Sequence, residues 1–230
     1  MNLENKLLIK LIKYIYKSGV CLRNWLYDKK IFSSYKSSIP IISVGNITAG
    51  GTGKTPFVVY LVKFCKKNGL NPAIITRGYK RASSGQILLI NNNNSVEIVG
   101  DEPFLLSSLC PDVDIIINKN RVAAAKWAEG STKKYDIIIL DDAFQHRAIA
   151  RDLNILLISP EQNMKDCPPS GNLREPLRPF FISFWMLFAK IKLFTLHISI
   201  LVGDKFLPKH GSYLVVHILL VSPPLNRRRF

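Results

Sequence analysis

The sequence predicts an α/β fold in which helices cover a parallel β-sheet, preceded by an N-terminal amphipathic helix. Short, continuously apolar segments alternate with helical segments from residue 39 onward, a pattern typical of a parallel sheet buried on both faces. A glycine-rich loop follows the first of these apolar segments and precedes a helical one. A hydrophobic content of 47% is enough for a substantial core and excludes wholesale disorder.

The individual elements follow from local patterns. Apolar runs predict strands at Ile39–Val44, Pro72–Thr76, Val113–Asn118, Tyr135–Leu140 and Leu153–Ser159. Helical patterns are expected at 2–27, from the glycine-rich loop through Lys67, at Asp101–Leu109 and at Arg121–Ala128. The asparagine run Asn91–Asn94 is expected to be an exposed turn.

Residues 2–27 predict an amphipathic helix, because at 100° per residue the apolar side chains fall on one broad face. The lysines in a narrow arc beside this face are Lys6, Lys10, Lys13 and Lys17. Two interpretations stay open. The helix packs on the domain core with a solvated lysine flank, or it lies at a membrane interface with its lysines among anionic headgroups. Each such lysine would contribute about 1 kcal/mol near an anionic surface.

Net charge and cysteine usage bound the partners and the compartment. The net charge of +16 points to an anionic partner: nucleic acid, an acidic membrane surface or a phosphorylated substrate. The four cysteines stand far apart without a CxxC pair. A disulfide framework and a zinc site are therefore not expected, and a reducing cytosol fits best.

The composition changes after Pro176. Only Asp204 of the sixteen acidic residues lies beyond this point, and Phe180–Val202 is almost wholly apolar without helical or strand periodicity. A transmembrane helix fits by length, but Lys190 and Lys192 would each cost about 2.5–3.5 kcal/mol in a bilayer. The predicted domains are an N-terminal membrane-associating helix and linker at 1–38, the core at 39–176, and an atypical apolar and basic tail at 177–230.

The segment from Ile41 to Thr55 has the pattern of a phosphate-binding loop: a strand, a glycine-rich turn and the start of a helix. Glycines let the backbone N–H groups curl toward phosphate oxygens, and the helix N-terminus adds its positive dipole. Lys54 would reach the β- and γ-phosphates of ATP, and the Thr55 hydroxyl would bind Mg²⁺. Thr48 stands where the usual pattern has its first glycine. The residues expected to bind nucleotide here are Thr48, Ala49, Gly50, Gly51, Thr52, Gly53, Lys54 and Thr55.

Two carboxylates, Asp141 and Asp142, end the apolar run Tyr135–Leu140. This is a Walker B arrangement, which places an acid near the Mg²⁺ at the carboxyl end of a parallel strand. Because aspartate is also common in turns that follow strands, a purely structural interpretation stays open at this stage. With the phosphate-binding loop upstream, we interpret both carboxylates as part of a metal site, in a sheet of the P-loop NTPase type.

Other polar clusters allow a structural and a functional interpretation. Asp101 and Glu102 follow Gly100, and a turn with an N-capping Asp101 would explain them structurally. Further candidates are Gln145 and His146, directly after the Walker B acids, and Arg174 with Glu175, beside a proline turn. A structural histidine and a surface salt bridge are the respective alternatives.

Taken together, these clusters resemble one family, the tetraacyldisaccharide 4′-kinases of lipid A biosynthesis. The matching segments occur in order and are SVGNITAGGTGKTP (43–56), ITRGYKR (75–81), VGDEP (99–103), NKNRVAAA (118–125), LDDAFQHR (140–147) and PSGNLREP (169–176). The family's own loop also has threonine at the position of Thr48. Ala143 stands where the family usually has glycine.

The resemblance implies transfer of the ATP γ-phosphate to the 4′-hydroxyl of a tetraacylated glucosamine disaccharide 1-phosphate, the lipid A precursor. It implies that Lys54 and Thr55 bind phosphate and Mg²⁺, that Asp141 and Asp142 belong to the metal site, and that Asp101 is the general base with Glu102 nearby. The other active-site positions that it implies are Arg77, Arg121, Gln145, His146, Arg174 and Glu175. Two of these arginines, Arg121 and Arg174, would neutralise phosphate charge.

The resemblance also suggests a location. The acyl chains of such a substrate stay in the bilayer, so the N-terminal helix would bind an anionic membrane surface. We expect a peripheral or monotopic protein at the cytoplasmic face of the bacterial inner membrane, with no nucleic acid partner.

The resemblance stops near Pro176. Family members continue with a second α/β half, which contributes a histidine that works with the aspartate of the GDEP motif. None of His197, His210 and His217 lies in a segment that matches a family motif. We therefore expect a truncated or frameshifted chain with little or no kinase turnover. Two alternatives stay open: a basic P-loop ATPase acting on nucleic acid, and a non-catalytic remnant that binds nucleotide or membrane.

Overall fold

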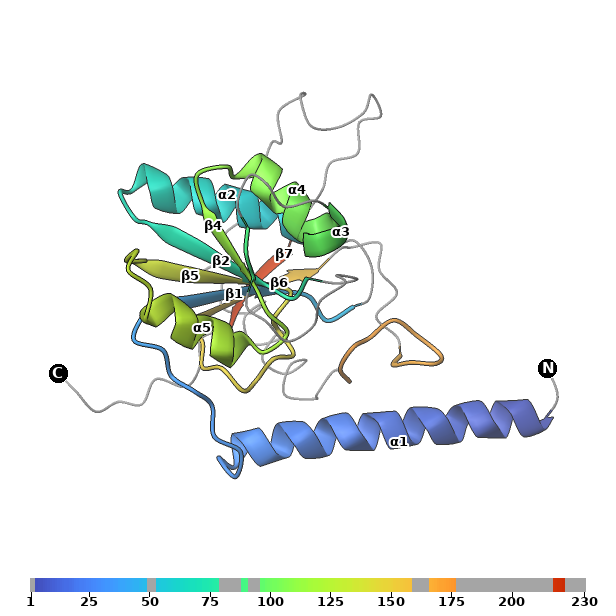
Figure 1. Cartoon of the computed structure of the whole chain (residues 1–230). Coiled ribbons are helices and arrows are strands. Elements are labelled where there is room, and N and C mark those ends of the chain that lie inside the picture. The colour runs from blue at the N-terminus through green and yellow to red at the C-terminus, as the bar shows by residue number, and fades with distance from the viewer. Residues whose placement is uncertain are drawn as a thin grey trace, which may run out of the picture. The chain divides into compact units, whose positions relative to one another are not determined.

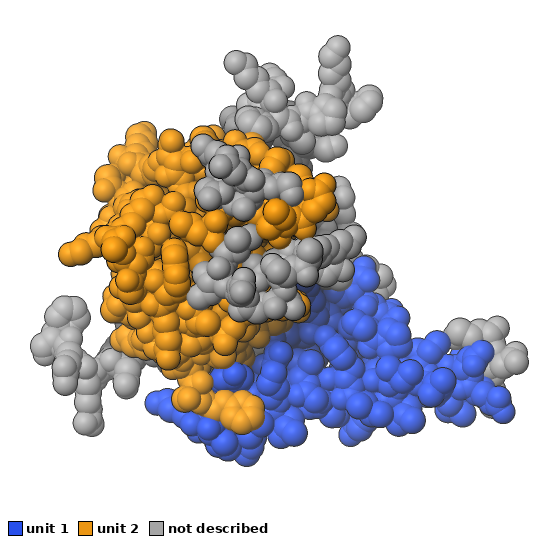
Figure 2. Space-filling view, in the orientation of Figure 1, with its two compact units in different colours: residues 1–31, 47–52, 157–218 blue, residues 32–46, 53–156, 219–230 orange. Residues whose placement is uncertain are grey.

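The computed structural model describes residues 3–48, 53–78, 88–90, 96–158, 166–176 and 217–221. The chain forms two compact units, which Figure 2 shows in different colours. Unit 1 comprises 1–31, 47–52 and 157–218, and unit 2 comprises 32–46, 53–156 and 219–230. The predicted domain boundaries after residues 38 and 176 stay a prediction. The predicted Asn91–Asn94 turn and the apolar run Phe180–Val202 lie outside the described residues.

The sheet has a parallel centre, as the sequence predicts. Its parallel strands are β1 (Ile41–Gly45), β2 (Pro72–Thr76), β4 (Asp114–Ile117), β5 (Ile137–Asp141) and β6 (Leu153–Ile158), in the order β4-β2-β5-β1-β6. At one edge β3 (Leu88–Leu89) pairs antiparallel with β4. At the other edge β7 (His217–Val221) lies beside β6. The edge strands β3 and β7 were not predicted.

Helices cover both faces of this sheet in unit 2. The helices are α2 (Lys54–Lys67), α3 (Val96–Val99), α4 (Asp101–Leu109) and α5 (Arg121–Glu129). Figure 1 shows α2 and α4 on one side of the strands and α5 on the other. The short α3 was not predicted, whereas α2, α4 and α5 lie where the sequence places helices.

The core of unit 2 consists mainly of the strand interiors. Ile75, Ile138 and Leu140 are completely buried, as the unbroken apolar runs require. On the α5 face the core continues through Ala124 and Ala125, whose small side chains let the helix lie close to the strands. Burying one large aliphatic side chain contributes about 1.5–3 kcal/mol, so the burial of this layer stabilises unit 2.

Strand register brings functional segments to one edge of the sheet. Val44 of β1 is paired with Asp141 of β5, and Thr76 of β2 with Ile117 of β4. The carboxyl ends of these parallel strands therefore lie at one edge. This is the edge at which α/β proteins of this topology bind their ligands.

The predicted N-terminal helix is α1 (Leu3–Asp28), a part of unit 1. Most of its large apolar side chains are exposed: Leu7, Leu8, Leu11, Ile12, Ile15, Leu22 and Trp25. The interpretation in which this face is buried in a core is therefore wrong for these side chains. Among the described residues, no helix combines the length and the apolar character needed to span a bilayer.

Candidate active site

The phosphate-binding loop leads from β1 into α2. Gly53 caps α2 in the left-handed conformation, with φ 73° and ψ 25°, which glycine adopts without strain. Gly53 provides no side-chain cap, so the first backbone N–H groups of α2 are suited to an anion. Lys54 and Thr55 begin the helix, while Ala49–Thr52 lie outside the described residues. Thr48 is buried and belongs, with 47–52, to unit 1.

Asp141 is fully buried at the carboxyl end of β5. Its Oδ2 accepts a hydrogen bond from the Thr76 hydroxyl at 3.2 Å, whereas its Oδ1 is buried with no hydrogen-bond partner among the residues described. Burial raises the pKa of Asp141 to about 7, and the nearby charges of Glu102 and Asp142 add to the effect. A buried carboxylate with an unused oxygen and two further carboxylates nearby is well suited to a cation.

Asp142 connects the Walker B strand to the loop lysine. Its backbone is left-handed, with φ 47°, a conformation that aspartate tolerates better than most residues. Its Oδ1 lies 3.6 Å from Nζ of Lys54, and the charge of Lys54 also lowers the pKa of the neighbouring Asp141. The structure thus brings together the predicted phosphate-binding lysine and both predicted metal-site carboxylates.

Arg121 is the buried cation of the site, with 2% of its surface exposed. Its Nη1 donates to the carbonyl oxygen of Asn118 at 2.9 Å and its Nη2 to that of Asp141 at 3.1 Å. Burial lowers the pKa of Arg121 to about 10, against the opposing effect of the nearby carboxylates. The guanidinium therefore stays charged at neutral pH and links the ends of β4 and β5.

The GDEP motif forms the start of α4. Gly100 has φ 91° and ψ 159°, a conformation essentially restricted to glycine. Asp101 is the first helical residue rather than the N-cap, so the structural interpretation of Asp101 as a capping residue is wrong. Asp101 is exposed, whereas the half-buried Glu102 is close enough for its charge to act on Asp141 and Arg121. The two adjacent acids therefore have different surroundings.

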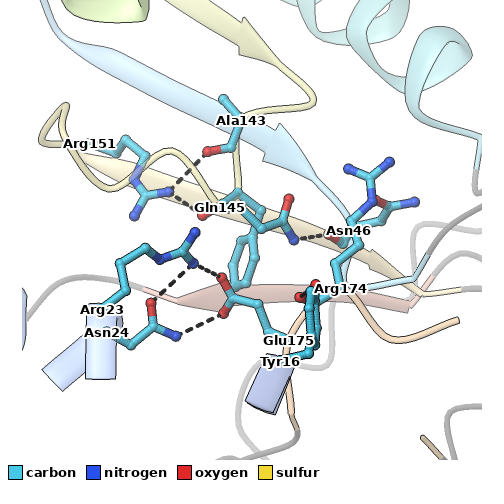
Figure 3. Close-up of polar contacts among 10 residues, drawn as sticks. Tyr16, Arg23, Asn24, Asn46, Ala143, Gln145, Arg151, Arg174 and Glu175 are labelled. Atoms are coloured by element: carbon cyan, nitrogen blue, oxygen red, sulfur yellow. Dashed lines mark hydrogen bonds and ion pairs between the residues drawn. The ribbon is translucent and has the colours of Figure 1, made fainter. Parts of the chain in front are cut away.

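The turn after β5 packs tightly against the end of β1. A Cβ atom on Gly45 would lie 2.6 Å from Cβ of Phe144, so glycine is required there. The side-chain amide of Gln145 donates to the carbonyl oxygen of Asn46 at 2.8 Å (Figure 3). Half-buried His146 lies in the same turn, and exposed Arg77 directly follows β2, from where its charge acts on Arg121.

Arg151 is a residue that sequence reasoning missed. Its Nη1 donates to the backbone oxygens of Ala143 at 3.3 Å and Phe144 at 2.8 Å, which fixes the turn that carries Gln145 (Figure 3). Arg151 follows the resembling segment LDDAFQHR by four positions. Its only signal was a basic residue just before a strand.

Arg174 and Glu175 belong to unit 1 and have partners within it. The Arg174 backbone N–H donates to the carbonyl oxygen of Ile47 at 2.7 Å. The Glu175 carboxylate accepts from Arg23 of α1 at 2.8 Å and from Asn24 at 3.4 Å (Figure 3). Glu175 therefore forms an ion pair with the N-terminal helix, which the sequence did not reveal.

The residues present fit a Mg²⁺ ion that is bound together with nucleotide. Among the described residues, no three His, Cys, Asp or Glu side chains are grouped so that they could hold a metal by themselves. Mg²⁺ at phosphate-transfer sites needs only one or two carboxylates, with phosphate oxygens and water as the other ligands. The unused Oδ1 of Asp141, with Asp142 and the Thr55 hydroxyl, provides such a partial set.

Comparison with known proteins decides the family. A family model described as tetraacyldisaccharide-1-P 4′-kinase matches residues 5–182. The chain belongs to this family. The tetraacyldisaccharide 4′-kinase of Aquifex aeolicus is 42% identical over 169 residues, which cover 72% of this chain and 52% of the relative. That of Chlorobaculum parvum is 41% identical over 171 residues, covering 71% and 47%.

A solved structure supports the 4′-kinase family and its fold. The crystal structure of the "apo" form of LpxK from Aquifex aeolicus in complex with ATP matches with a TM-score of 0.67 and 40% identity. The match covers 73% of this chain and 53% of that protein. The chain thus spans about half the length of the curated 4′-kinases it matches. Both the predicted family and the predicted α/β fold are confirmed.

Proposed function

We propose that this chain carries the ATP site of a tetraacyldisaccharide 4′-kinase, which transfers the γ-phosphate to the 4′-hydroxyl of tetraacyldisaccharide 1-phosphate, and that its own turnover is far below that of a full-length relative. The observation that carries the proposal is the group formed by Lys54, Asp141 and Asp142 at the carboxyl edge of the sheet, where the end of β5 pairs with β1, the strand that precedes the loop. The names of the relatives supply the substrate.

Each residue of the cluster has a role in this chemistry. Lys54 and the first N–H groups of α2 bind the β- and γ-phosphates, and the buried guanidinium of Arg121 offsets the negative charge of the nearby carboxylates. Asp141, Asp142 and Thr55 would hold Mg²⁺, which would neutralise phosphate charge when bound. Exposed Asp101 accepts the proton of the 4′-hydroxyl. The hydroxyl oxygen forms the new bond to the γ-phosphorus, whose bond to the leaving ADP breaks.

The kinase proposal is tested with radiolabelled γ-phosphate. Wild-type chain, Asp101→Asn and the full-length Aquifex aeolicus relative are incubated with MgATP and the tetraacyl disaccharide 1-phosphate. We expect labelled lipid from the relative and little or none from the wild-type chain above the level of Asp101→Asn. A wild-type rate within about tenfold of the relative, a difference of only about 1.4 kcal/mol in barrier, would contradict the low turnover expected for this chain. ATP hydrolysis that needs DNA rather than the disaccharide would instead support the nucleic-acid ATPase.

We also propose that α1 binds an anionic membrane at the cytoplasmic face of the inner membrane. Its exposed apolar face supports this, but its lysines are not equivalent. Lys13 and Lys17 form ion pairs with Asp166, whereas Lys6 and Lys10 are exposed. The expectation that all of these lysines face headgroups is therefore revised, and we assign the lipid contact to Lys6 and Lys10.

Vesicle co-sedimentation tests this assignment. Deleting residues 1–27 should release the chain from vesicles that contain anionic lipid. Lys6→Glu with Lys10→Glu should weaken binding at low salt more than the same change at two exposed lysines outside α1, Lys63 and Lys67. Binding that does not change in either variant, or binding that prefers DNA to vesicles, would contradict the proposal.

A further inference from the structure

The segment 166–176 contacts α1 through polar groups spread over its length. Lys13 and Lys17 both pair with Asp166, and Nζ of Lys17 lies 2.9 Å from Oδ1. The Tyr16 hydroxyl donates to the backbone oxygen of Arg174 at 2.8 Å. Further along α1, the last contacts are those of Arg23 and Asn24 with Glu175. From Lys13 to Asn24 the helix rises about 16 Å, so α1 is held along three turns.

Some of these contacts are more buried than ordinary surface ion pairs. Asn24 is only 5% exposed although most of α1 is open to solvent, and the side chain of Glu175 is 16% exposed. The adjacent Cys167 is fully buried, and charges on Lys17 and Lys13 act on its thiol. Hydrogen bonds from Lys13 and Lys17 hold the pKa of Asp166 far below its ordinary value. Such a set of partly buried polar contacts favours one position of the helix on this segment.

The other side of the same segment holds the start of the phosphate-binding loop. Leu173 forms an antiparallel bridge with Thr48, and the Arg174 N–H donates to the Ile47 oxygen. The segment is itself compact, because Leu173 N–H donates to the Asp166 oxygen at 2.9 Å. A Cβ on Gly171 would lie 2.3 Å from that same oxygen, so the close approach requires glycine.

We propose that Glu175 is a positioning residue: with Asp166 it docks α1 on segment 166–176, and this docking holds Ile47 and Thr48 in place for nucleotide binding. The residues involved all belong to unit 1. Glu175 thus acts on the loop through the backbone of Leu173 and Arg174. This inference rests on the proposed nucleotide binding. It makes MgATP affinity depend on the N-terminal helix.

The test uses the full chain with two readouts. The first is the rate of maleimide labelling of Cys167, located by mass spectrometry, which reports undocking of α1 without any nucleotide. The second is the Kd for MgATP, measured by calorimetry. The variant Asp166→Asn/Glu175→Gln removes both docking carboxylates with little change in shape. The matched control is Glu4→Gln, the same change at an exposed carboxylate of α1.

We expect the double variant to label Cys167 faster and to bind MgATP about tenfold more weakly, whereas Glu4→Gln matches wild type in both. Exchanging the charges in Arg23→Glu/Glu175→Arg should restore part of the affinity that Glu175→Arg alone loses. Equal labelling of Cys167 in wild type and double variant would overturn the docking. Faster labelling with unchanged MgATP affinity would overturn the positioning role. A wild type that binds no MgATP would refute the proposed function, while the labelling still tests the docking.

Discussion

The buried carboxyl group of Asp141 predicts an unusual dependence of stability on pH. Burial raises its pKa from an ordinary 3.8 to about 7. Because the folded state binds this proton more tightly than the unfolded state, the stabilising contribution is complete below about pH 4 and is lost as the pH rises to about 7. The difference between the two pKa values corresponds to about 4 kcal/mol at pH 8.

The substitution Asp141→Asn removes the titrating group but keeps an oxygen that accepts from Thr76. Without nucleotide and Mg²⁺, we expect the variant to be about 2–4 kcal/mol more stable than wild type near pH 8, with the gap shrinking toward pH 4. Urea unfolding followed by tryptophan fluorescence measures both values. Asp112→Asn, at an 82% exposed side chain, is the control and should follow wild type at each pH.

A second measurement separates function from stability. MgATP should stabilise wild type and should stabilise Asp141→Asn far less, because the variant lacks the charge that attracts the cation. If the free energy of unfolding of Asp141→Asn stays below that of wild type from pH 4 to pH 8 and varies with pH in the same way, burial does not raise the pKa of Asp141.

Three further substitutions test the packing around the site, each by its urea midpoint. Arg121→Leu should cost about 3–5 kcal/mol, because it leaves buried carboxylates without their cation, and a loss below about 1 kcal/mol would speak against a buried charge network. Gly45→Ala should lower the free energy of unfolding by about 1–3 kcal/mol, because the added methyl group clashes with Phe144. An unchanged stability would contradict the tight packing of this turn. Asn120→Ala should cost about 1 kcal/mol, because the Asn120 side chain caps α5 by accepting from two backbone N–H groups, and no loss would mean that this cap is dispensable.

The sequence predicted the elements whose signals are local. Pro72–Thr76 and Asp101–Leu109 have the bounds that were predicted, because a proline or a glycine marks where each begins. The two-residue β3 is too short to show a period. The edge strand β7 lies in the tail at 177–230, where no strand was predicted although His217–Val221 is a short apolar run. Such a run is ambiguous when neighbouring elements do not give it a context.

The site residues also differ in whether a local sequence signal predicts them. Lys54, Asp141 and Asp142 were predictable because a strand end and a helix start fix their places. The ion pair of Arg23 with Glu175 was not, since the two residues are 152 positions apart. With 32 basic and 16 acidic residues in the chain, charge alone does not select a partner. The different surroundings of Asp101 and Glu102 likewise depend on how α4 packs.

One titration decides whether the loop binds nucleotide. Calorimetry with MgATP compares wild type, Lys54→Ala and Lys63→Ala, the last being an exposed lysine on the same helix. We expect wild type and Lys63→Ala to bind equally and Lys54→Ala to bind at least about tenfold more weakly, a loss of about 1.4 kcal/mol or more. Equal binding by wild type and Lys54→Ala would show that the loop does not hold the phosphates.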